Sequence, residues 1–149
     1  MKKQSVTTPV AMLYYSSPQI VLQEVPDEIS LALAVSGCPV GCVGCHSTHT
    51  YSPTYGRPLT LEVLATLLRQ NKHLSCVLFY GGEWAPDDLI PLLALVKNTG
   101  LKTCLYTGKE LPDIQSQILL YLDYIKTGPY IEALGGLNSP TTNQRFIAL

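Results

Sequence analysis

Residues 29–46 read ISLALAVSGCPVGCVGCH, and both the expected fold and the expected chemistry start from this stretch. Its first seven residues, Ile29–Val35, form a nearly continuous apolar run, which is typical of a strand buried on both faces of a parallel sheet. A loop rich in glycine and cysteine follows directly. Since parallel α/β sheets gather ligand sites where their strands end, we expect a functional site immediately after this strand.

The rest of the chain alternates between strand and helix patterns. The second expected helix carries Leu89, Leu92, Leu93 and Val96 on one face. Thr60 suits the N-cap of the first helix, Asp87 or Asp88 that of the second, and Gly100 its C-terminal stop. We expect strands at Ile29–Val35, Cys76–Tyr80, Lys102–Tyr106, Asp123–Lys126 and Arg145–Leu149, helices at Leu61–Gln70, Asp88–Thr99 and Pro112–Leu120, and edge strands at Ala11–Tyr15 and Ile20–Val25.

This alternation predicts an α/β fold in which right-handed crossovers join parallel strands. A complete eight-unit barrel requires about 200–250 residues, and the chain has 149. We therefore expect a partial, open TIM-like β/α barrel of about four to six parallel strands with outer helices. Residues 1–149 are expected to form one domain, because no linker or repeat divides them.

The charge pattern narrows the classes of function. Ten Lys and Arg residues against eleven Asp and Glu residues leave a formal net charge of −1, with no basic run, so binding to nucleic acid is not expected. No apolar stretch approaches the roughly 20 residues of a membrane span. Although Met1–Lys3 is basic, Gln4–Pro9 is too polar for a signal peptide. We expect a cytoplasmic protein with no membrane partner.

The chain has five cysteines, and three of them fall within eight residues. An odd, clustered set is unlike the disulfide framework of a secreted domain and favours a metal or redox site. Cys76 and Cys104 stand apart in apolar, strand-like runs. We interpret these two as small buried hydrophobic residues.

The clustered cysteines Cys38, Cys42 and Cys45 have the spacing C-x3-C-x2-C. Thiolates hold iron–sulfur clusters, normally four for a [4Fe–4S] cluster, so three would leave one iron open for a reactive ligand. The alternative is structural zinc, which would accept a Cys3His set completed by His46 or His49. The spacing by itself leaves both kinds of site open.

The cysteine spacing resembles the cluster motif of the radical S-adenosylmethionine enzymes. Its form C-x3-C-x-G-C followed by His resembles the small activating proteins of anaerobic ribonucleotide reductase, which generate glycyl radicals. Further segments resemble motifs of these activases: Gly81-Gly82-Glu83 their GGE, Tyr106-Thr107-Gly108 their YTG, and Lys126–Tyr130 with Thr141–Arg145 their G-P-[FY] and NQR elements. The resemblance extends from about residue 29 to residue 149.

The resemblance implies two cofactors, a [4Fe–4S] cluster on Cys38, Cys42 and Cys45 and S-adenosyl-L-methionine. It implies that Glu83 accepts the methionine ammonium group. Trp84 stands where the family usually has Pro, and we expect it to be a core residue in preference to a lid. The cofactor-binding residues that the resemblance implies are Gly44, Cys45, His46, Gly81, Gly82, Glu83, Thr107 and Gly108.

The implied activity is reductive cleavage of S-adenosylmethionine to a 5′-deoxyadenosyl radical, which generates the glycyl radical on the large subunit of anaerobic ribonucleotide reductase. The expected partners are that subunit and a reducing electron donor such as a flavodoxin or ferredoxin. The segment Tyr130–Arg145 is a candidate docking element, the alternative being an ordinary surface loop. Two other functions remain open: a small radical enzyme acting on a metabolite, such as a carboxy-deazaguanine-type synthase, and a zinc or iron–sulfur binding module.

Overall fold

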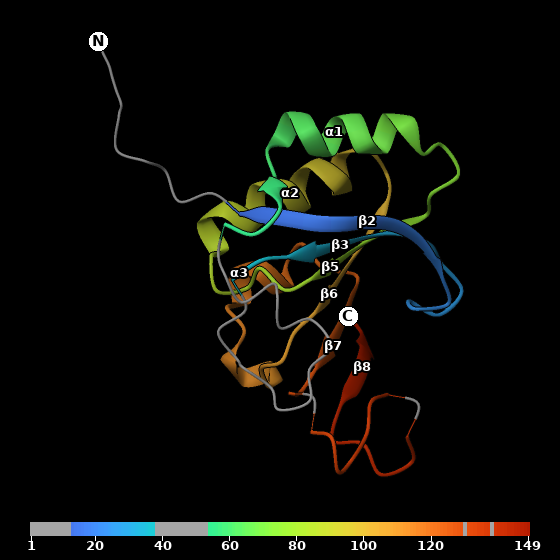
Figure 1. Ribbon diagram of the computed structural model, residues 1–149, viewed down its shortest axis with the longest axis vertical. Coiled ribbons are helices and arrows are strands. Elements are labelled where there is room, and N and C mark those ends of the chain that lie inside the picture. The colour runs from blue at the N-terminus through green and yellow to red at the C-terminus, as the bar shows by residue number, and fades with distance from the viewer. Residues whose placement is uncertain (1–12, 38–53, 130, 138) are drawn as a thin grey trace.

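The computed structural model describes residues 13–37, 54–129, 131–137 and 139–149. In this part of the chain, strands form one seven-stranded sheet in the order β4-β2-β3-β5-β6-β7-β8 (Figure 1). The strands are β2 (Tyr14–Leu22), β3 (Ile29–Val35), β4 (Arg57–Pro58), β5 (Cys76–Tyr80), β6 (Lys102–Tyr106), β7 (Tyr124–Thr127) and β8 (Arg145–Ala148).

The four central strands β3, β5, β6 and β7 are parallel neighbours. The bounds of β3, β5 and β6 are those that the sequence predicts, and β7 is displaced by one residue. The prediction works best for β3 and β5, because these strands are nearly continuous apolar runs that end before Ser36 and before Gly81. These four strands determine where the candidate site lies.

The sheet is mixed, which corrects the expectation of a purely parallel set. β8 pairs antiparallel with β7, and β2 pairs antiparallel with both β3 and β4. Parallel strands need long crossovers, whereas short or looping connections return the chain in the opposite direction. The described architecture is therefore a mixed α/β sheet with a four-stranded parallel centre.

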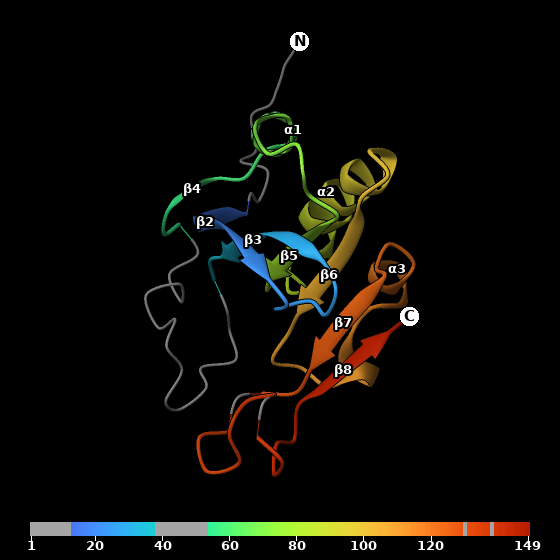
Figure 2. The same ribbon diagram turned by 90° about the vertical axis from the view of Figure 1, so that its right-hand side faces the viewer.

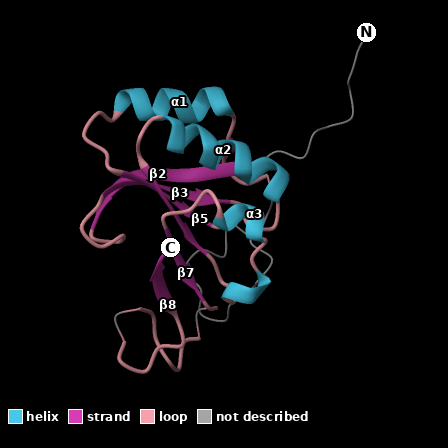
Figure 3. Ribbon diagram, turned by 180° about the vertical axis from the view of Figure 1, so that it is seen from behind, coloured by secondary structure: helices cyan, strands magenta, loops and turns pink. Residues whose placement is uncertain are grey.

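Three helices cover one face of the sheet, as Figures 2 and 3 show. They are α1 (Leu61–Gln70), α2 (Pro86–Asn98) and the short α3 (Ser116–Leu119). Alternate residues such as Leu33, Phe79 and Leu105 face them in the main core. The opposite face, called here the helix-free face, has a smaller buried cluster of Val25, Ala32, Cys76, Leu78 and Cys104. No described helix is long and apolar enough to cross a membrane.

The interpretation of Cys76 and Cys104 as buried hydrophobic residues is confirmed. Both are free thiols with no exposed surface. Burial raises the pKa of the Cys76 thiol to about 12 and raises that of Cys104 as well. Buried thiols held in this neutral form pack as small apolar side chains, as interpreted.

The helix ends follow local chemistry, with one correction. Thr60 caps α1 as predicted, and its hydroxyl accepts the N–H of Val63 at 3.0 Å. α2 begins two residues before the predicted start, because Pro86 occupies its first turn and Ala85, not an aspartate, is the N-cap. Gly100 has φ +85° directly after the helix, as a C-terminal stop requires.

The predicted helix over Pro112–Leu120 is broken in two. A 3-10 turn, η2 (Leu111–Asp113), and α3 are separated by Ile114 and Gln115, both with extended backbones. Ile114 is buried in the main core. The expected continuous helix is thus interrupted by a residue that turns inward, which single-sequence periodicity does not reveal.

The described parts of the two predicted edge strands belong to one strand, β2, which ends at Leu22 and not at Val25; Ala11 and Met12 lie outside the described residues. Its pairing with β3 shifts between Ser16 and Gln19, and Ser17 has φ +52°. This is a β-bulge, which tolerates Pro18 inside a strand. The prediction breaks the strand between Tyr15 and Ile20, whereas the chain only bends there. The two-residue strand β4 is an element that the sequence does not predict.

Candidate functional site

The four central strands end side by side, and a single row of paired residues crosses them. Ala34 pairs with Tyr80, Tyr80 with Tyr106, and Tyr106 with Lys126. The segments that follow this row carry the predicted motifs. We call this edge of the sheet the rim; among the described residues it comprises Ser36–Gly37, Gly81–Glu83, Thr107–Gly108 and Gly128–Pro129.

Main-chain hydrogen bonds extend the ladder one step beyond the strands and hold the rim segments together. The N–H of Gly81 donates to the carbonyl of Tyr106, and that of Thr107 to Lys126, each at 2.9 Å. The N–H of Gly128 donates to Lys109 at 2.8 Å. The expectation that these motifs share one edge of the sheet is therefore confirmed for the described segments.

The predicted cluster ligands Cys38, Cys42 and Cys45 lie outside the described residues, as do Gly44, His46 and His49. The described residues on either side of this segment are nevertheless fixed at the rim. Ser36 donates its main-chain N–H to Tyr14 at 2.9 Å and its hydroxyl to the carbonyl of Tyr55 at 2.5 Å. The described residues before and after 38–53 therefore lie together at one corner of the sheet, which the sequence does not reveal.

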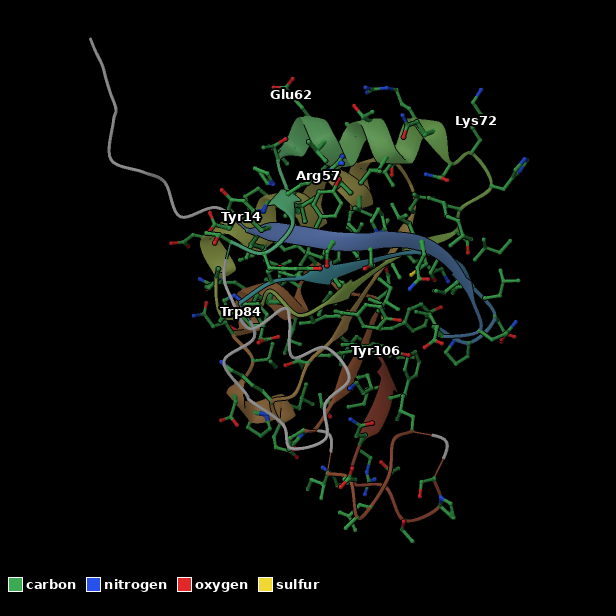
Figure 4. The ribbon with its side chains drawn as sticks, viewed as in Figure 1. Tyr14, Arg57, Glu62, Lys72, Trp84 and Tyr106 are labelled. Atoms are coloured by element: carbon green, nitrogen blue, oxygen red, sulfur yellow. The ribbon has the colours of Figure 1, made fainter. Side chains whose placement is uncertain are left out.

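Gly81 is required by its backbone and by Trp84. Its φ is +97°, and a Cβ at this position would lie 2.6 Å from the indole ring. Trp84 packs against the main core, as expected, and lies at the edge of the molecule where α2 begins (Figure 4). The aromatic ring that replaces the family's usual Pro therefore supports the turn that leads into Glu83.

Glu83 is buried at the rim without a partner. Its residue is 5% exposed, and neither carboxylate oxygen has a hydrogen-bond partner among the described residues. Burial raises the pKa of the Glu83 carboxyl, and the nearby Thr107 hydroxyl and Lys109 charge offset this only in part. A carboxylate in this position costs free energy unless a cation is bound to it.

Thr107 and Gly108 follow β6 on the neighbouring strand. Thr107 is buried, and its hydroxyl accepts the main-chain N–H of Lys109 at 3.0 Å, which fixes a tight turn. Gly108 is not among the glycines with positive φ, so no backbone conformation explains it. Its predicted contact with the cofactor stays a prediction.

Hydrogen bonds join the two C-terminal motifs, Gly128–Pro129 and Asn143–Gln144. Gly128 has φ +99°, and its carbonyl accepts a hydrogen bond from the buried Gln144 side chain at 3.3 Å. The Asn143 amide donates to the carbonyl of Pro129 at 3.1 Å, and its own oxygen is buried without a partner in the described structure. These residues close the β7–β8 connection next to the rim, a role that sequence reasoning does not identify.

The described part of the candidate docking element Tyr130–Arg145 is internally braced; Tyr130 and Asn138 lie outside the described residues. The Thr141 hydroxyl donates to Leu134 at 2.8 Å, and the Thr142 hydroxyl to Gly135 at 3.1 Å. These hydrogen bonds give the described part of the loop a defined conformation where it extends from the rim. Its docking role stays a prediction.

A row of aromatic rings lies just below the rim on the helix-free face. Tyr80 and Tyr106 meet edge to face at 5.5 Å, and Tyr106 meets Phe146 at 6.5 Å. The Lys126 ammonium lies 5.1 Å from the Tyr106 ring centroid. Tyr106, labelled in Figure 4, also donates its hydroxyl to the carbonyl of Glu24. The alternation along β5 and β6 could have predicted this row.

The described rim fits the cofactor that the sequence implies. An ammonium group placed at Glu83 would satisfy the two orphaned carboxylate oxygens through charge-assisted hydrogen bonds. Gly82, with φ +112°, packs closely on the core beside Glu83, since a Cβ there would lie 3.3 Å from the Leu89 side chain. The rim can therefore bind the amino end of an amino-acid-like ligand.

Comparison with known proteins gives a family, relatives and a fold. Residues 29–146 match the family described as a 4Fe-4S single cluster domain. The 7-carboxy-7-deazaguanine synthase of Escherichia coli (strain K12) is 27% identical over 98 residues, covering 53% of this chain and 44% of that protein. The synthase of Shigella flexneri matches equally. The match thus spans less than half the length of these curated relatives.

A solved structure shares the fold. The crystal structure of QueE from Escherichia coli superimposes with a TM-score of 0.57 at 22% identity, over 77% of this chain and 70% of that chain. The family match favours iron–sulfur over zinc at the cysteines. The family match and the sequence relatives together support a radical S-adenosylmethionine protein whose cofactors are a [4Fe–4S] cluster and S-adenosylmethionine.

The packing of Trp84 on Gly81 predicts a graded loss of stability. Gly100→Ala is the matched control, because Gly100 also has positive φ but a Cβ added there would have nothing within 4 Å. We expect Gly100→Ala to lower the free energy of unfolding by about 1–2 kcal/mol and Gly81→Ala by about 1–3 kcal/mol more, measured by denaturant titration. Equal losses would show that the indole does not press on Gly81.

The unpartnered Glu83 predicts a gain of stability on neutralisation. Its pKa is raised in the fold, so the ionised carboxyl destabilises the protein increasingly as pH rises through and above the pKa of the unfolded chain. Glu83→Gln should therefore raise the Tm of the cluster-free protein at neutral pH. An unchanged or lowered Tm would mean that the carboxylate is already compensated.

Glu28 provides the opposite control. Burial raises its pKa, but hydrogen bonding from Tyr124 at 2.7 Å and the Lys102 charge outweigh burial, and the net shift is downward. Its stabilisation is present above the unfolded pKa and is lost as pH falls. Glu28→Gln should lower the Tm at neutral pH.

Glu83→Gln should also weaken the binding of S-adenosylmethionine. Loss of a charge-assisted hydrogen bond of about 1.5–3 kcal/mol corresponds to roughly 10- to 100-fold weaker binding. The measurement is anaerobic calorimetry of the cluster-loaded protein with S-adenosylmethionine, with iron content confirming that the cluster is retained. Wild-type affinity in this variant would remove Glu83 from the binding site.

Proposed function

The chain belongs to the family of 4Fe-4S single cluster domains, and we propose that it activates anaerobic ribonucleotide reductase by generating a glycyl radical on the large subunit. The proposal rests on one observation: Glu83 is buried at the rim beside Thr107, and its carboxylate oxygens have no hydrogen-bond partner among the described residues. An enzyme retains so unfavourable a group when a cationic ligand compensates it.

The chain's own residues bind and orient the ligands in this proposal. Cys38, Cys42 and Cys45 would hold the cluster, while Glu83 would hold the methionine ammonium and so direct the sulfonium toward the cluster. When bound, the reduced cluster and S-adenosylmethionine supply a 5′-deoxyadenosyl radical, chemistry that belongs to the cofactors. The packed turn of Gly81 and Trp84 keeps Glu83 in place.

Residues from the C-terminal part of the chain that lie at the rim favour a polypeptide substrate. The interlock of Gly128 and Pro129 with Asn143 and Gln144 involves the two motifs that resemble those of the activases. We take the sheet to be an open partial barrel, whose helices lie on one face and leave the helix-free face as the side that a partner protein would approach (Figure 2). The proposed electron donor is a flavodoxin or ferredoxin, in a cytoplasmic setting.

A second candidate is supported by the sequence relatives. The matched relatives are 7-carboxy-7-deazaguanine synthases, so a radical enzyme acting on a small metabolite is the alternative. The aromatic row with Lys126 would suit a flat, anionic molecule. The hydrogen bond from Gln144 to Gly128 favours the activase, because it joins two segments that resemble activase motifs.

Product analysis tests the proposal. After anaerobic reconstitution with iron and sulfide, we expect the reduced protein to release 5′-deoxyadenosine from S-adenosylmethionine. With the large subunit of an anaerobic ribonucleotide reductase, we expect a glycyl-radical signal in electron paramagnetic resonance. Formation of 7-carboxy-7-deazaguanine without a glycyl radical would support the second candidate, and a colourless protein holding zinc would contradict both.

A further inference from the structure

The outer edge of β8 offers main-chain groups that no described residue pairs. The N–H of Leu149 donates to Asp123 at 2.8 Å, and the antiparallel register pairs Ile125 with Ile147. Because such pairing alternates, odd-numbered residues of this strand bond to β7. Phe146 and Ala148 therefore direct their N–H and C=O groups away from β7, and no described strand follows β8 in the sheet.

The two edges of the sheet differ in protection. The opposite edge is the two-residue strand β4, which ends with Pro58 and so cannot be extended readily. β8 has neither a proline nor a bulge, and Ala148 is exposed on it. An unprotected edge strand is a template for another strand.

The position of this edge relates it to the rim. Because β8 is antiparallel to β7, its first residue Arg145 lies beside Thr127 at the rim. Arg145 directly follows Asn143 and Gln144, whose side chains bond to the segment after β7. Phe146 also joins the aromatic row on the helix-free face through Tyr106. A chain laid along β8 therefore leads toward the rim near Gly128 and the helix-free face.

We propose that the outer edge of β8 binds an extended segment of the partner polypeptide by β-augmentation, presenting its glycine to the rim. This inference rests on the proposed function. Glycine has no side chain to be recognised, so selection must act on the main chain and on neighbouring residues. Strand addition supplies main-chain recognition, and side chains alternating to the helix-free face can contact the aromatic row.

A second copy of this chain fits the edge less well. Two β8 strands could exchange hydrogen bonds only at Phe146 and Ala148, since the strand has four residues. Stable dimers normally bury about 1,200 Å² or more, which so short a pairing does not provide. An extended segment held at the rim as well gains from both contacts.

Ala148→Pro tests the proposal in the cluster-loaded protein. Proline removes the outward N–H, and its ring blocks an incoming strand, while the hydrogen bonds of Ile147 and Leu149 to β7 remain. Ala148→Val is the matched control, because it retains the N–H. We expect Ala148→Pro to weaken binding of the reductase large subunit about tenfold or more and to lower the glycyl-radical yield, with unchanged 5′-deoxyadenosine release in the absence of the subunit.

Hydrogen exchange gives a reading that does not depend on a variant. The amides of Phe146 and Ala148 should exchange rapidly in the wild-type protein and become protected when the large subunit binds. Protection already present in the isolated protein, or protection that arises from self-association at higher concentration, would overturn the inference.

The outcomes separate the two proposals. If wild type activates the subunit and Ala148→Pro binds and activates it equally, the β8 inference is wrong while the proposed function stands. If wild type cleaves S-adenosylmethionine but neither binds nor activates the subunit, the proposed function fails and the inference fails with it.

Discussion

The candidate site depends on the parallel pairing of β3, β5, β6 and β7, which places four strand ends in one row. That row runs through Ala34, Tyr80, Tyr106 and Lys126. Side-chain packing of the three helices on one face of the sheet fixes the register, because a slip of one residue would turn the strand side chains of the main core to the opposite face. The motifs separated by nearly a hundred residues in sequence therefore meet at the rim.

Two buried carboxyl groups differ in their partners, and therefore in whether they contribute to stability or to ligand binding. Glu28 is held by Tyr124 and Lys102 and contributes to stability. Glu83, similarly buried, has no partner in the described structure. Folding alone would favour an apolar residue there, so the unpartnered group is best explained by a cation that it binds. The rim tolerates the free-energy cost of this buried carboxylate because Trp84 packs closely on the turn that precedes Glu83.

Sequence reasoning predicts the parts of the fold in which local pattern and tertiary environment agree. β3, β5 and β6 are apolar runs, and α1 has both a capping threonine and an apolar stripe. It fails where tertiary contacts decide: the bulge that joins β2, the early start of α2 and the inward turn at Ile114. In the site, the resemblance identifies Glu83, but only the structure shows that its carboxylate has no hydrogen-bond partner among the described residues. The roles of Ser36 and Gln144 depend on distant carbonyl groups and leave no local signal.

The proposed chemistry requires that Cys38, Cys42 and Cys45 hold a cluster with one iron open to S-adenosylmethionine. The most direct test is electron paramagnetic resonance of the anaerobically reconstituted, reduced protein, recorded with and without S-adenosylmethionine. The account predicts a [4Fe–4S] signal whose shape changes on addition of the cofactor, because the ligand binds the cluster itself. A [4Fe–4S] signal that does not change would show that a fourth protein ligand closes the cluster, and would contradict the account.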